Sequence, residues 1–274
     1  MRRNTILVVT VSQGRRSSIL KTISSVATVN LGDIDHYIVV PRNQLGDFQT
    51  TENTFFIPQP DPDLGLYTTL NRVINDRIAQ YEWVTYLNDD DFWLPSFRKL
   101  IDTVNQHPQA DAIYAKVNFV NTQGNKIAEQ TSSPRYTAIK YLYQGDVVLF
   151  TQQATLVKSK VFVDQGGFDE SYKLIADTDF WIRAIDAGVE FLYLDEPCAA
   201  YARHRYQLSN NLPLLEQEKK RLFAQMGSLS EARVLFEKLR FRLYNLKIYA
   251  KRAFTYGQIE VLKIIKRLDQ NERT

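Results

Sequence analysis

The hydrophobic pattern divides the first 120 residues into short apolar runs separated by stretches with helical periodicity. Runs rich in β-branched and aromatic residues predict strands at residues 4–11, 36–40, 54–57, 82–87 and 112–120. Residues 17–26, 66–79 and 95–107 lie between these runs and predict helices. Strands that alternate with helices indicate βαβ units, so the pattern predicts an open α/β domain with a mainly parallel sheet.

The pattern continues with less regular spacing after residue 120. Residues 121–126 predict a hairpin turn, residues 177–188 predict a helix that a glycine ends, and residues 191–197 predict another strand. The α/β pattern therefore extends well into the second half of the chain.

The last quarter of the chain has a different character. Gly227 predicts the end of one helix, and Ser228 followed by Glu231 predicts a capping box that begins the next helix. Leucines then recur at spacings of four, four and three residues, and form one helical stripe: Leu235, Leu239, Leu243 and Leu246. We therefore predict one domain over residues 1–211 and a helical region over residues 212–274.

Composition places the chain among ordinary globular proteins. Its 274 residues are 44% hydrophobic, which is enough to bury a sizeable core. No apolar run reaches the length of about 18 residues that suggests a membrane-spanning helix. The apolar run near the N-terminus is short and contains threonines, so it predicts a strand and not a signal peptide. A single cysteine, Cys198, excludes an internal disulfide framework, and we expect a cytoplasmic protein.

The net charge of +3 is unevenly distributed. Residues 212–274 contain 14 Lys/Arg and 7 Asp/Glu, a net charge of +7, whereas residues 1–211 carry −4. A basic helix with an apolar stripe either lies on an anionic membrane surface or packs on the rest of the chain or on a second subunit, and we favour packing. A peripheral position at the inner face of the membrane and a homo-oligomer both stay open. Nucleic acid is not expected, because no recognised fold or stacking aromatics accompany the charge.

Three adjacent carboxylates, Asp89, Asp90 and Asp91, directly follow the strand predicted at residues 82–87. In open α/β sheets ligands bind beyond the carboxyl ends of the strands, so the cluster lies where a site is expected. Neighbouring carboxylates raise each other's pKa unless a cation lies among them. Mg²⁺ and Mn²⁺ prefer oxygen ligands and are often held by one or two carboxylates together with substrate phosphates. The competing interpretation is a set of acids that stabilise a helix N-terminus.

Three blocks of the sequence resemble family 2 glycosyltransferases, in the same order and with similar spacing. "PDPDLGLYTTLNRVI" followed by "WVTYLNDDDFWLP" is similar to "PDxGIYDAMNxGI…YIxFLNxDDxxxP". "QQATLVKSKVFVDQGGFDESYKLIADTDFWIRAIDAG" is similar to "GGFDExxxxxEDYDLWLRLxxxG", and "YARHRYQLS" resembles "YRxHxxxxS". The resemblance extends from about residue 4 to residue 210.

The resemblance implies a GT-A-fold enzyme that transfers a sugar, with inversion, from a nucleotide-diphosphate sugar to an acceptor hydroxyl. It implies a UDP- or GDP-sugar donor, a glycan or lipid-linked acceptor, and a role in cell-surface polysaccharide or glycan synthesis. It implies Mn²⁺ or Mg²⁺ at Asp91 and Asp89, donor contacts from Asp63, Asp89, Asp90, His204 and Arg203, and a catalytic base at Asp177.

The chemistry of glycosyl transfer suits these residues. A departing nucleoside diphosphate gains negative charge, which a metal ion stabilises as a Lewis acid. The incoming hydroxyl must lose its proton, and a carboxylate opposite the leaving group can accept it. Asp177 lies at the start of a predicted helix and far from Asp91 in sequence, whereas Asp179 is expected to point elsewhere because it lies two residues along the helix.

The sequence departs from the family at positions that bear on function. The segment "DGxSTDGT", which contacts the nucleotide base, is replaced by residues 40–48, and this leaves Arg42 or Asn43 for base recognition. Ala176 replaces the glutamate of the family's "ED" pair. Two other functions therefore stay open: a metal-dependent nucleotidyltransferase, and a degenerate module that binds sugar nucleotides or glycans without catalysis.

Overall fold

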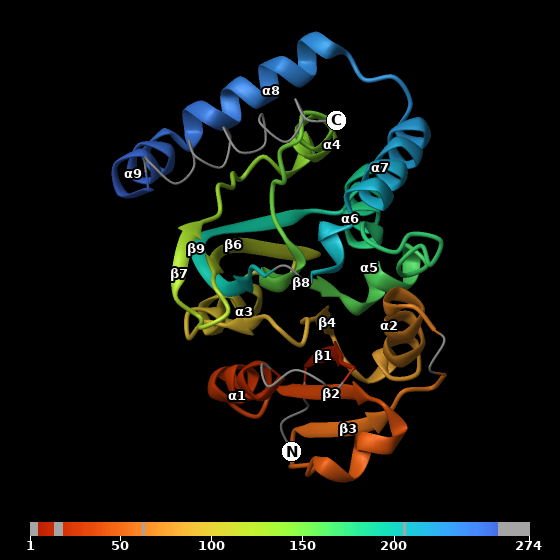
Figure 1. Cartoon of the computed structure of the whole chain (residues 1–274). Helices are drawn as coiled ribbons and strands as arrows, with labels where there is room; N and C mark the ends of the chain where they lie inside the picture. Colours follow the sequence, from red (N-terminus) through yellow and green to blue (C-terminus); the bar gives the residue numbers. More distant parts are fainter. Residues whose placement is uncertain (1–4, 14–18, 62–63, 205–206, 257–274) are drawn as a thin grey trace.

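The computed structural model describes residues 5–13, 19–61, 64–204 and 207–256. The strands are β1 (Ile6–Val11), β2 (Ile34–Val40), β3 (Thr54–Pro58), β4 (Trp83–Tyr86), β5 (Phe92–Trp93), β6 (Ala112–Val120), β7 (Lys126–Glu129), β8 (Thr155–Lys158) and β9 (Phe191–Ala202). The helices are α1 (Ile19–Val29), α2 (Leu66–Asn75), α3 (Phe97–Gln106), α4 (Ile139–Gln144), α5 (Ser159–Asp164), α6 (Ala176–Asp186), α7 (Leu212–Met226), α8 (Glu231–Tyr244) and α9 (Leu246–Tyr256). Figure 1 shows their arrangement.

The strands of the described residues form one mixed sheet in the order β3-β2-β1-β4-β8-β6-β9-β5, and β7 pairs with β6. β1 runs parallel to β2 and β4, β2 runs parallel to β3, and β6 runs parallel to β9. β8 is antiparallel to both β4 and β6 and joins the two parallel parts. The predicted α/β fold with a mainly parallel sheet is therefore confirmed.

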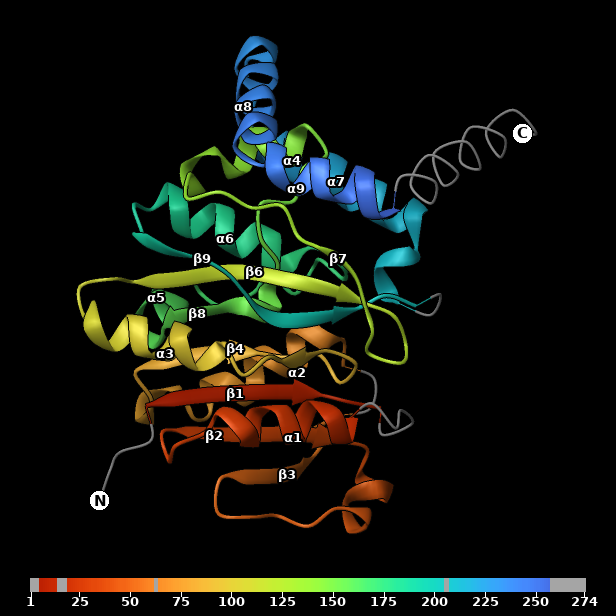
Figure 2. The ribbon, with the colours of Figure 1, turned by 90° about the vertical axis from the view of Figure 1, so that its left-hand side faces the viewer.

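Helices cover both faces of the sheet (Figure 2). α1 and α3 pack on one face, and α2, α4, α5 and α6 pack on the other. In β1, Ile6 and Val8 pack into the core beneath α1 and α3, whereas Leu7 and Val9 pack into the core beneath α2, α4, α5 and α6. A strand that is buried on both faces needs apolar residues at successive positions, which is why its sequence is a continuous hydrophobic run.

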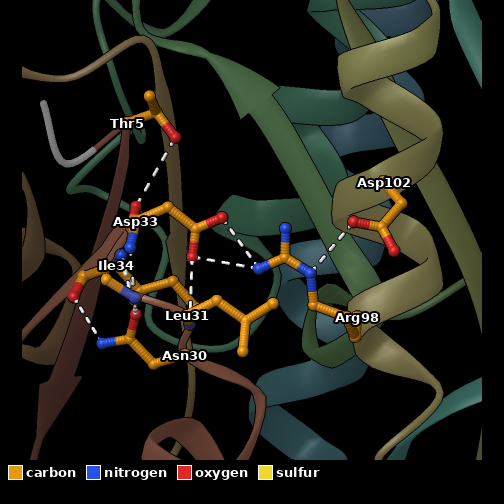
Figure 3. Close-up of polar contacts among 8 residues, drawn as sticks. Thr5, Asn30, Leu31, Asp33, Ile34, Arg98 and Asp102 are labelled. Atoms are coloured by element: carbon orange, nitrogen blue, oxygen red, sulfur yellow. Dashed lines mark hydrogen bonds and ion pairs between the residues drawn. The ribbon is translucent and has the colours of Figure 1, made fainter. Parts of the chain in front are cut away.

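Polar contacts fix the amino ends of the strands (Figure 3). Arg98 of α3 donates to both carboxylate oxygens of Asp33, at 3.0 and 2.8 Å. The Asn30 side-chain oxygen accepts from the amides of Asp33 and Ile34, at 3.1 and 3.2 Å. Thr5, directly before β1, donates to the carbonyl of Asp33 at 3.5 Å. This network holds the rim opposite to the carboxyl ends of β1, β2 and β4.

The C-terminal helices share the core of the sheet. α7 and α8 contribute Leu222 and Phe241, which are 2% and 3% exposed, to the core that also contains α2 and α6. α7 ends at Met226, and the next residue, Gly227, has a φ of +73°. The predicted helix end at Gly227 is therefore confirmed. The N-cap of α8 is Ser230, whose Oγ accepts from the amide of Arg233 at 3.4 Å, so the predicted cap at Ser228 is wrong. The division into residues 1–211 and 212–274 stays a prediction.

The leucine stripe of the C-terminal region faces away from this core. Leu235, Leu239, Leu243 and Leu246 are 69%, 56%, 62% and 61% exposed. α8 is held through another face, because Glu237 and Phe241 are buried and Asn245, just beyond the helix, is buried as well. Across the described part of the chain, no helix combines the length and the apolar character needed to cross a membrane.

Candidate functional site

The acidic loop, residues 88–91, lies where two neighbouring strands end. It follows β4, and Ser12 directly follows β1, the parallel neighbour of β4. The Ser12 hydroxyl donates to Asp89 Oδ2 at 2.7 Å, and both residues are buried. Because parallel strands end at the same rim, residues that directly follow them meet there. The acidic loop therefore lies at the rim where open α/β sheets commonly bind ligands.

Asp91 turns into the protein and is fully buried. Its Oδ1 accepts from the amide of Ala202 at 2.8 Å, and its Oδ2 accepts from Asn88 Nδ2 at 3.0 Å and Gln153 Nε2 at 2.7 Å. Burial and the charge of Asp90 raise the pKa of Asp91 to about 8, although the three hydrogen bonds oppose this rise. Asp91 thus ties the acidic loop to the end of β9 and to the segment before β8.

Asp90 faces the segment that follows β9. Its Oδ2 lies 2.7 Å from His204 Nε2, and the two side chains are 11% and 13% exposed. The guanidinium of Arg203 lies over the rings of Phe119 and Tyr201, 5.0 and 5.1 Å from their centres. The structure thus brings His204 to the acidic loop and leaves the exposed Arg203 beside it in sequence. Asp63, predicted to contact the donor, lies outside the described residues.

Asp177 lies in the first turn of α6. Its Oδ1 accepts from the amide of Thr178 at 2.8 Å, and the Tyr67 hydroxyl lies 3.5 Å away. Burial raises the pKa of Asp177 to about 6, although these hydrogen bonds oppose the rise. A carboxylate with this pKa is mostly ionised at neutral pH and remains basic enough to accept a proton.

Asp179 is engaged elsewhere, as its helical position predicts. It is 5% exposed, and its Oδ2 accepts from Arg183 Nε at 2.8 Å. The same guanidinium donates to the carbonyl of Gly167 at 2.8 Å. Asp179 therefore holds α6 to the preceding turn.

Two tyrosines connect the acidic loop with Asp177. Burial raises the pKa of Tyr86, the last residue of β4, well above its ordinary value, and the charges of Asp177 and Asp91 add to this rise. Burial also raises the pKa of Tyr201 in β9, again with contributions from Asp91 and Asp177. Asp91 and Asp177 therefore both lie near these two tyrosines, which stand in the last part of β4 and of β9.

The acidic loop has the chemistry of an open cation site. Asp89, Asp90 and Asp91 supply hard oxygen donors, and a cation would oppose the burial and the charge of Asp90 that raise the pKa of Asp91. Within the described residues, no three His, Cys, Asp or Glu side chains form a group that could hold a metal ion alone. The loop thus offers oxygen donors of the kind that divalent cations prefer, and not a complete ligand set.

Sequence reasoning missed several residues of this rim. Ser12 follows a strand as directly as the acidic loop does, and that position is a signal that could have identified it. Gln153 and Tyr67 carry no such signal, because their partners lie 62 and 110 residues away. Glu218, on the C-terminal helix α7, accepts from three backbone amides just before α6 and has no sequence signal either.

Comparison with known proteins gives a consistent result. No family model matches the chain. The chain is 24% identical over 186 residues to an uncharacterized glycosyltransferase of Methanocaldococcus jannaschii, which covers 64% of this chain and 62% of that protein. It is 23% identical over 118 residues to an uncharacterized glycosyltransferase of Haemophilus influenzae, which covers 42% and 40%. The matches thus span less than two thirds of either relative.

The fold matches crystal structures of S. aureus TarS, residues 1–349. The complex with UDP-GlcNAc gives a TM-score of 0.64 at 15% identity, over 88% of this chain and 73% of that one. The complex with UDP gives a TM-score of 0.61 at 14% identity, over 93% and 76%. By sequence and by fold the chain is therefore related to glycosyltransferases, as the resemblance of its three sequence blocks implied.

Proposed function

We propose that the chain is an inverting glycosyltransferase that uses a UDP- or GDP-sugar. Its acceptor is the hydroxyl of a glycan or a lipid-linked saccharide in cell-surface polysaccharide or glycan synthesis. The observation that carries this proposal is the pair of acidic groups near the same tyrosines, the acidic loop and Asp177, in which the pKa values of Asp91 and Asp177 are raised. The TarS structures contain UDP-GlcNAc and UDP, so a UDP-sugar is the first donor to test.

Asp177 acts as the general base in this proposal. The acceptor oxygen forms a bond to the anomeric carbon while the bond from that carbon to the diphosphate oxygen breaks. The electron pair leaves with the diphosphate, and the hydroxyl proton passes to Asp177. The Thr178 amide, at 2.8 Å, orients the carboxylate, and Tyr67 lies beside it at 3.5 Å.

The acidic loop faces the diphosphate in this proposal. Asp89, Asp90 and Asp91 would hold Mn²⁺ or Mg²⁺, and Asp91 has about one acceptor position left because three hydrogen bonds already use its oxygens. When bound, the ion supplies Lewis-acid stabilisation of the leaving group. His204 holds Asp90 in place, and the guanidinium of Arg203 can pair with a phosphate.

A thermal-shift panel tests donor binding, because a ligand of the native state raises the apparent melting temperature. UDP, GDP and their sugars are compared with Mn²⁺ and with a chelator. Product analysis then separates the reaction classes. Free nucleoside diphosphate supports sugar transfer, whereas pyrophosphate shows nucleotidyl transfer. Binding with neither transfer nor donor hydrolysis above background would show a non-catalytic module.

We further propose that the leucine stripe, Leu235, Leu239, Leu243 and Leu246, contacts an anionic lipid surface. Five exposed basic residues lie on α8 and α9 with the stripe: Arg233, Arg240, Arg242, Lys247 and Lys251. Among the residues of these two helices whose burial is described, one acidic residue, Glu231, is exposed. Apolar side chains flanked by basic ones are typical of helices that lie in a lipid interface. A second copy docked through the same face would bring like charges together.

Vesicle sedimentation tests this contact. The protein should bind vesicles of phosphatidylcholine and phosphatidylglycerol at low salt, and bind pure phosphatidylcholine several-fold more weakly. Leu239→Gln with Leu243→Gln should weaken binding several-fold, whereas Leu31→Gln, at a site 62% exposed in the α1–β2 turn, should not. If the full-length protein does not bind anionic vesicles but is a dimer that the double variant converts to monomers, the stripe is a subunit interface.

A further inference from the structure

Glu218 of α7 holds the turn that precedes α6. Its side chain is buried, and the residue is 4% exposed. Its Oε1 accepts from the amide of Lys173 at 2.6 Å, and its Oε2 accepts from the amides of Leu174 and Ile175 at 2.9 and 3.3 Å. These three residues directly precede Ala176, the first residue of α6, so Glu218 contacts the chain just ahead of Asp177.

Glu218 lies just ahead of the start of α6. The N-cap residue is Ile175, which provides no side-chain hydrogen bond to the first turn. Helix N-termini leave amides without partners and favour a negative charge. Glu218 supplies both an acceptor and a charge from another helix, 43 residues away from Ile175 in sequence. It bonds the turn that leads into α6, whereas a local Asp or Ser cap would accept from amides of the first turn itself.

Other contacts fix α7 against the same turn. The Tyr172 hydroxyl donates to Gln225 Oε1 at 2.7 Å, and the guanidinium of Arg221 lies 3.6 Å from the centre of the Tyr172 ring. The Tyr67 hydroxyl donates to the carbonyl of Leu174 at 3.2 Å and also lies 3.5 Å from Asp177. Displacement of the turn would therefore move the immediate surroundings of Asp177.

We propose that Glu218 is a positioning residue for Asp177, through which the C-terminal region sets the geometry of the base. This inference rests on the proposed function. Glu218 contacts the backbone of the turn and acts on the reaction only through Asp177. The C-terminal helix α7 is then part of the catalytic machinery, although the sequence predicts it as an appendage.

Glu218→Gln tests the proposal. The amide keeps the size of the side chain but leaves one acceptor oxygen and turns an NH₂ group toward a backbone N–H. With Asp177 displaced, kcat at saturating donor and acceptor should fall roughly 10- to 100-fold, because small misplacements of catalytic groups are costly. The affinity for UDP should stay within about twofold, because the acidic loop does not contact Glu218. Glu216→Gln, exposed on the same helix, is the matched control.

A double-mutant cycle separates positioning from a general loss of structure. If Glu218 acts through Asp177, adding Glu218→Gln to Asp177→Asn should lower kcat little further, since the base is already lost. Additive losses would overturn the proposal. Glu218→Asp, which keeps both oxygens on a shorter side chain, should restore part of the lost kcat.

The acid limb of the kcat profile gives a second readout. The charge of Asp177 acts on four tyrosines, Tyr67, Tyr86, Tyr143 and Tyr201, and the charge of Glu218 also acts on Tyr67 and Tyr143. These hydroxyls stay neutral near pH 6, so the limb there reports Asp177. Because Glu218→Gln also removes a negative charge, the limb is compared with that of Glu218→Asp, which keeps the charge. A released turn should expose Asp177 and move the limb to lower pH in both variants, whereas a limb that stays in place in both would overturn the positioning role.

Amide hydrogen exchange keeps the two proposals distinguishable. Glu218→Gln should speed exchange at Lys173, Leu174 and Ile175, and Glu216→Gln should not. If no donor gives turnover, the proposed function fails, and exchange still shows whether Glu218 holds the turn. If Asp177→Asn abolishes turnover while Glu218→Gln behaves as Glu216→Gln does, the positioning role alone fails.

Discussion

Buried carboxylates in this chain differ in what stabilises their charge. Asp179 has the guanidinium of Arg183, and Glu218 has three backbone amides. Asp91 has three neutral donors and the charge of Asp90 beside it, and its pKa rises to about 8. Asp177 has one amide at 2.8 Å and a pKa of about 6. Raised values at one rim are typical of a functional site.

Turnover should depend on the ionisation of Asp177. The ionised form is the base, so kcat should rise about tenfold per pH unit below pH 6 and level off above about 6, because burial raises this pKa. An ordinary aspartate would reach its plateau near pH 4. The measurement is kcat against pH at saturating donor and acceptor.

Asp177→Asn should lower kcat roughly 10²- to 10⁴-fold and leave UDP affinity unchanged, because the variant removes only basicity. Asp179→Asn is the control, since the Asp179 carboxylate pairs with Arg183 and is not bonded to Asp177, Thr178 or Tyr67. Near-normal transfer by Asp177→Asn would show that another group acts as the general base.

Asp90 and Asp91 should respond differently to substitution. Asp91→Ala leaves the amide of Ala202, Asn88 and Gln153 without their acceptor, so unfolding should become easier by about 2–4 kcal/mol. Asp90→Ala should change the free energy of unfolding by about 1 kcal/mol or less and abolish cation-dependent UDP binding. Denaturant titration and thermal shift with UDP measure the two effects. Equal stability losses would contradict this division of roles.

At the scale of elements, the turn between α5 and α6 depends on two glycines in the left-handed region. Gly166 and Gly167 have φ of +71° and +70°. A Cβ on Gly167 would lie 2.7 Å from Asn71 Oδ1, which accepts from the amide of Phe168 at 2.9 Å, whereas a Cβ on Gly166 would meet open space. The two glycines thus face different constraints.

Gly166→Ala should cost about 1–2 kcal/mol of stability, because alanine is strained at positive φ. Gly167→Ala should cost about 1–3 kcal/mol more, since it also displaces the hydrogen bond from Phe168 to Asn71. Denaturant titration of both variants checks the difference. Equal costs would show that Asn71 moves aside freely.

Sequence patterns predicted the elements that are long or buried on both faces. β6 runs over Ala112–Val120, as predicted. β1 begins at Ile6 and not at the predicted residue 4, which lies outside the described residues. β5 and α5 have two and six residues, too few for periodicity to identify. β9 continues past the predicted end to Ala202, because its last residues pair with β5 and β6, strands distant in sequence.

The candidate site was predictable from the sequence only in part. The acidic loop and Asp177 stand next to predicted elements, so their positions follow from the chain's pattern. The residues that hold them do not, because Ser12, Gln153 and Glu218 reach their partners over 77, 62 and 44 residues. Such pairs arise from tertiary packing, which no local pattern records.

At the scale of the whole molecule, the C-terminal helices complete the core. Residues 1–211 alone would lose Leu222 and Phe241 from that core, and burial of each such side chain contributes about 2–5 kcal/mol. The 1–211 fragment should therefore melt well below the full chain or aggregate, as calorimetry and light scattering can show. Leu222→Ala and Phe241→Ala in the full chain are the graded controls. A fragment that melts with the full chain would establish residues 1–211 as an independent domain.

The Asp91–Ala202 hydrogen bond has a consequence during synthesis. A ribosome makes the acidic loop 111 residues before it makes Ala202, and Glu218 follows later still. Domains fold as units when their last necessary segment has emerged. A nascent or prematurely terminated chain would therefore carry every acidic side chain of the site without the geometry that makes them reactive. A nascent chain that ends between residues 178 and 201 would hold Asp91 without the amide of Ala202, and Asp177 without the bonds of Glu218 to the preceding turn.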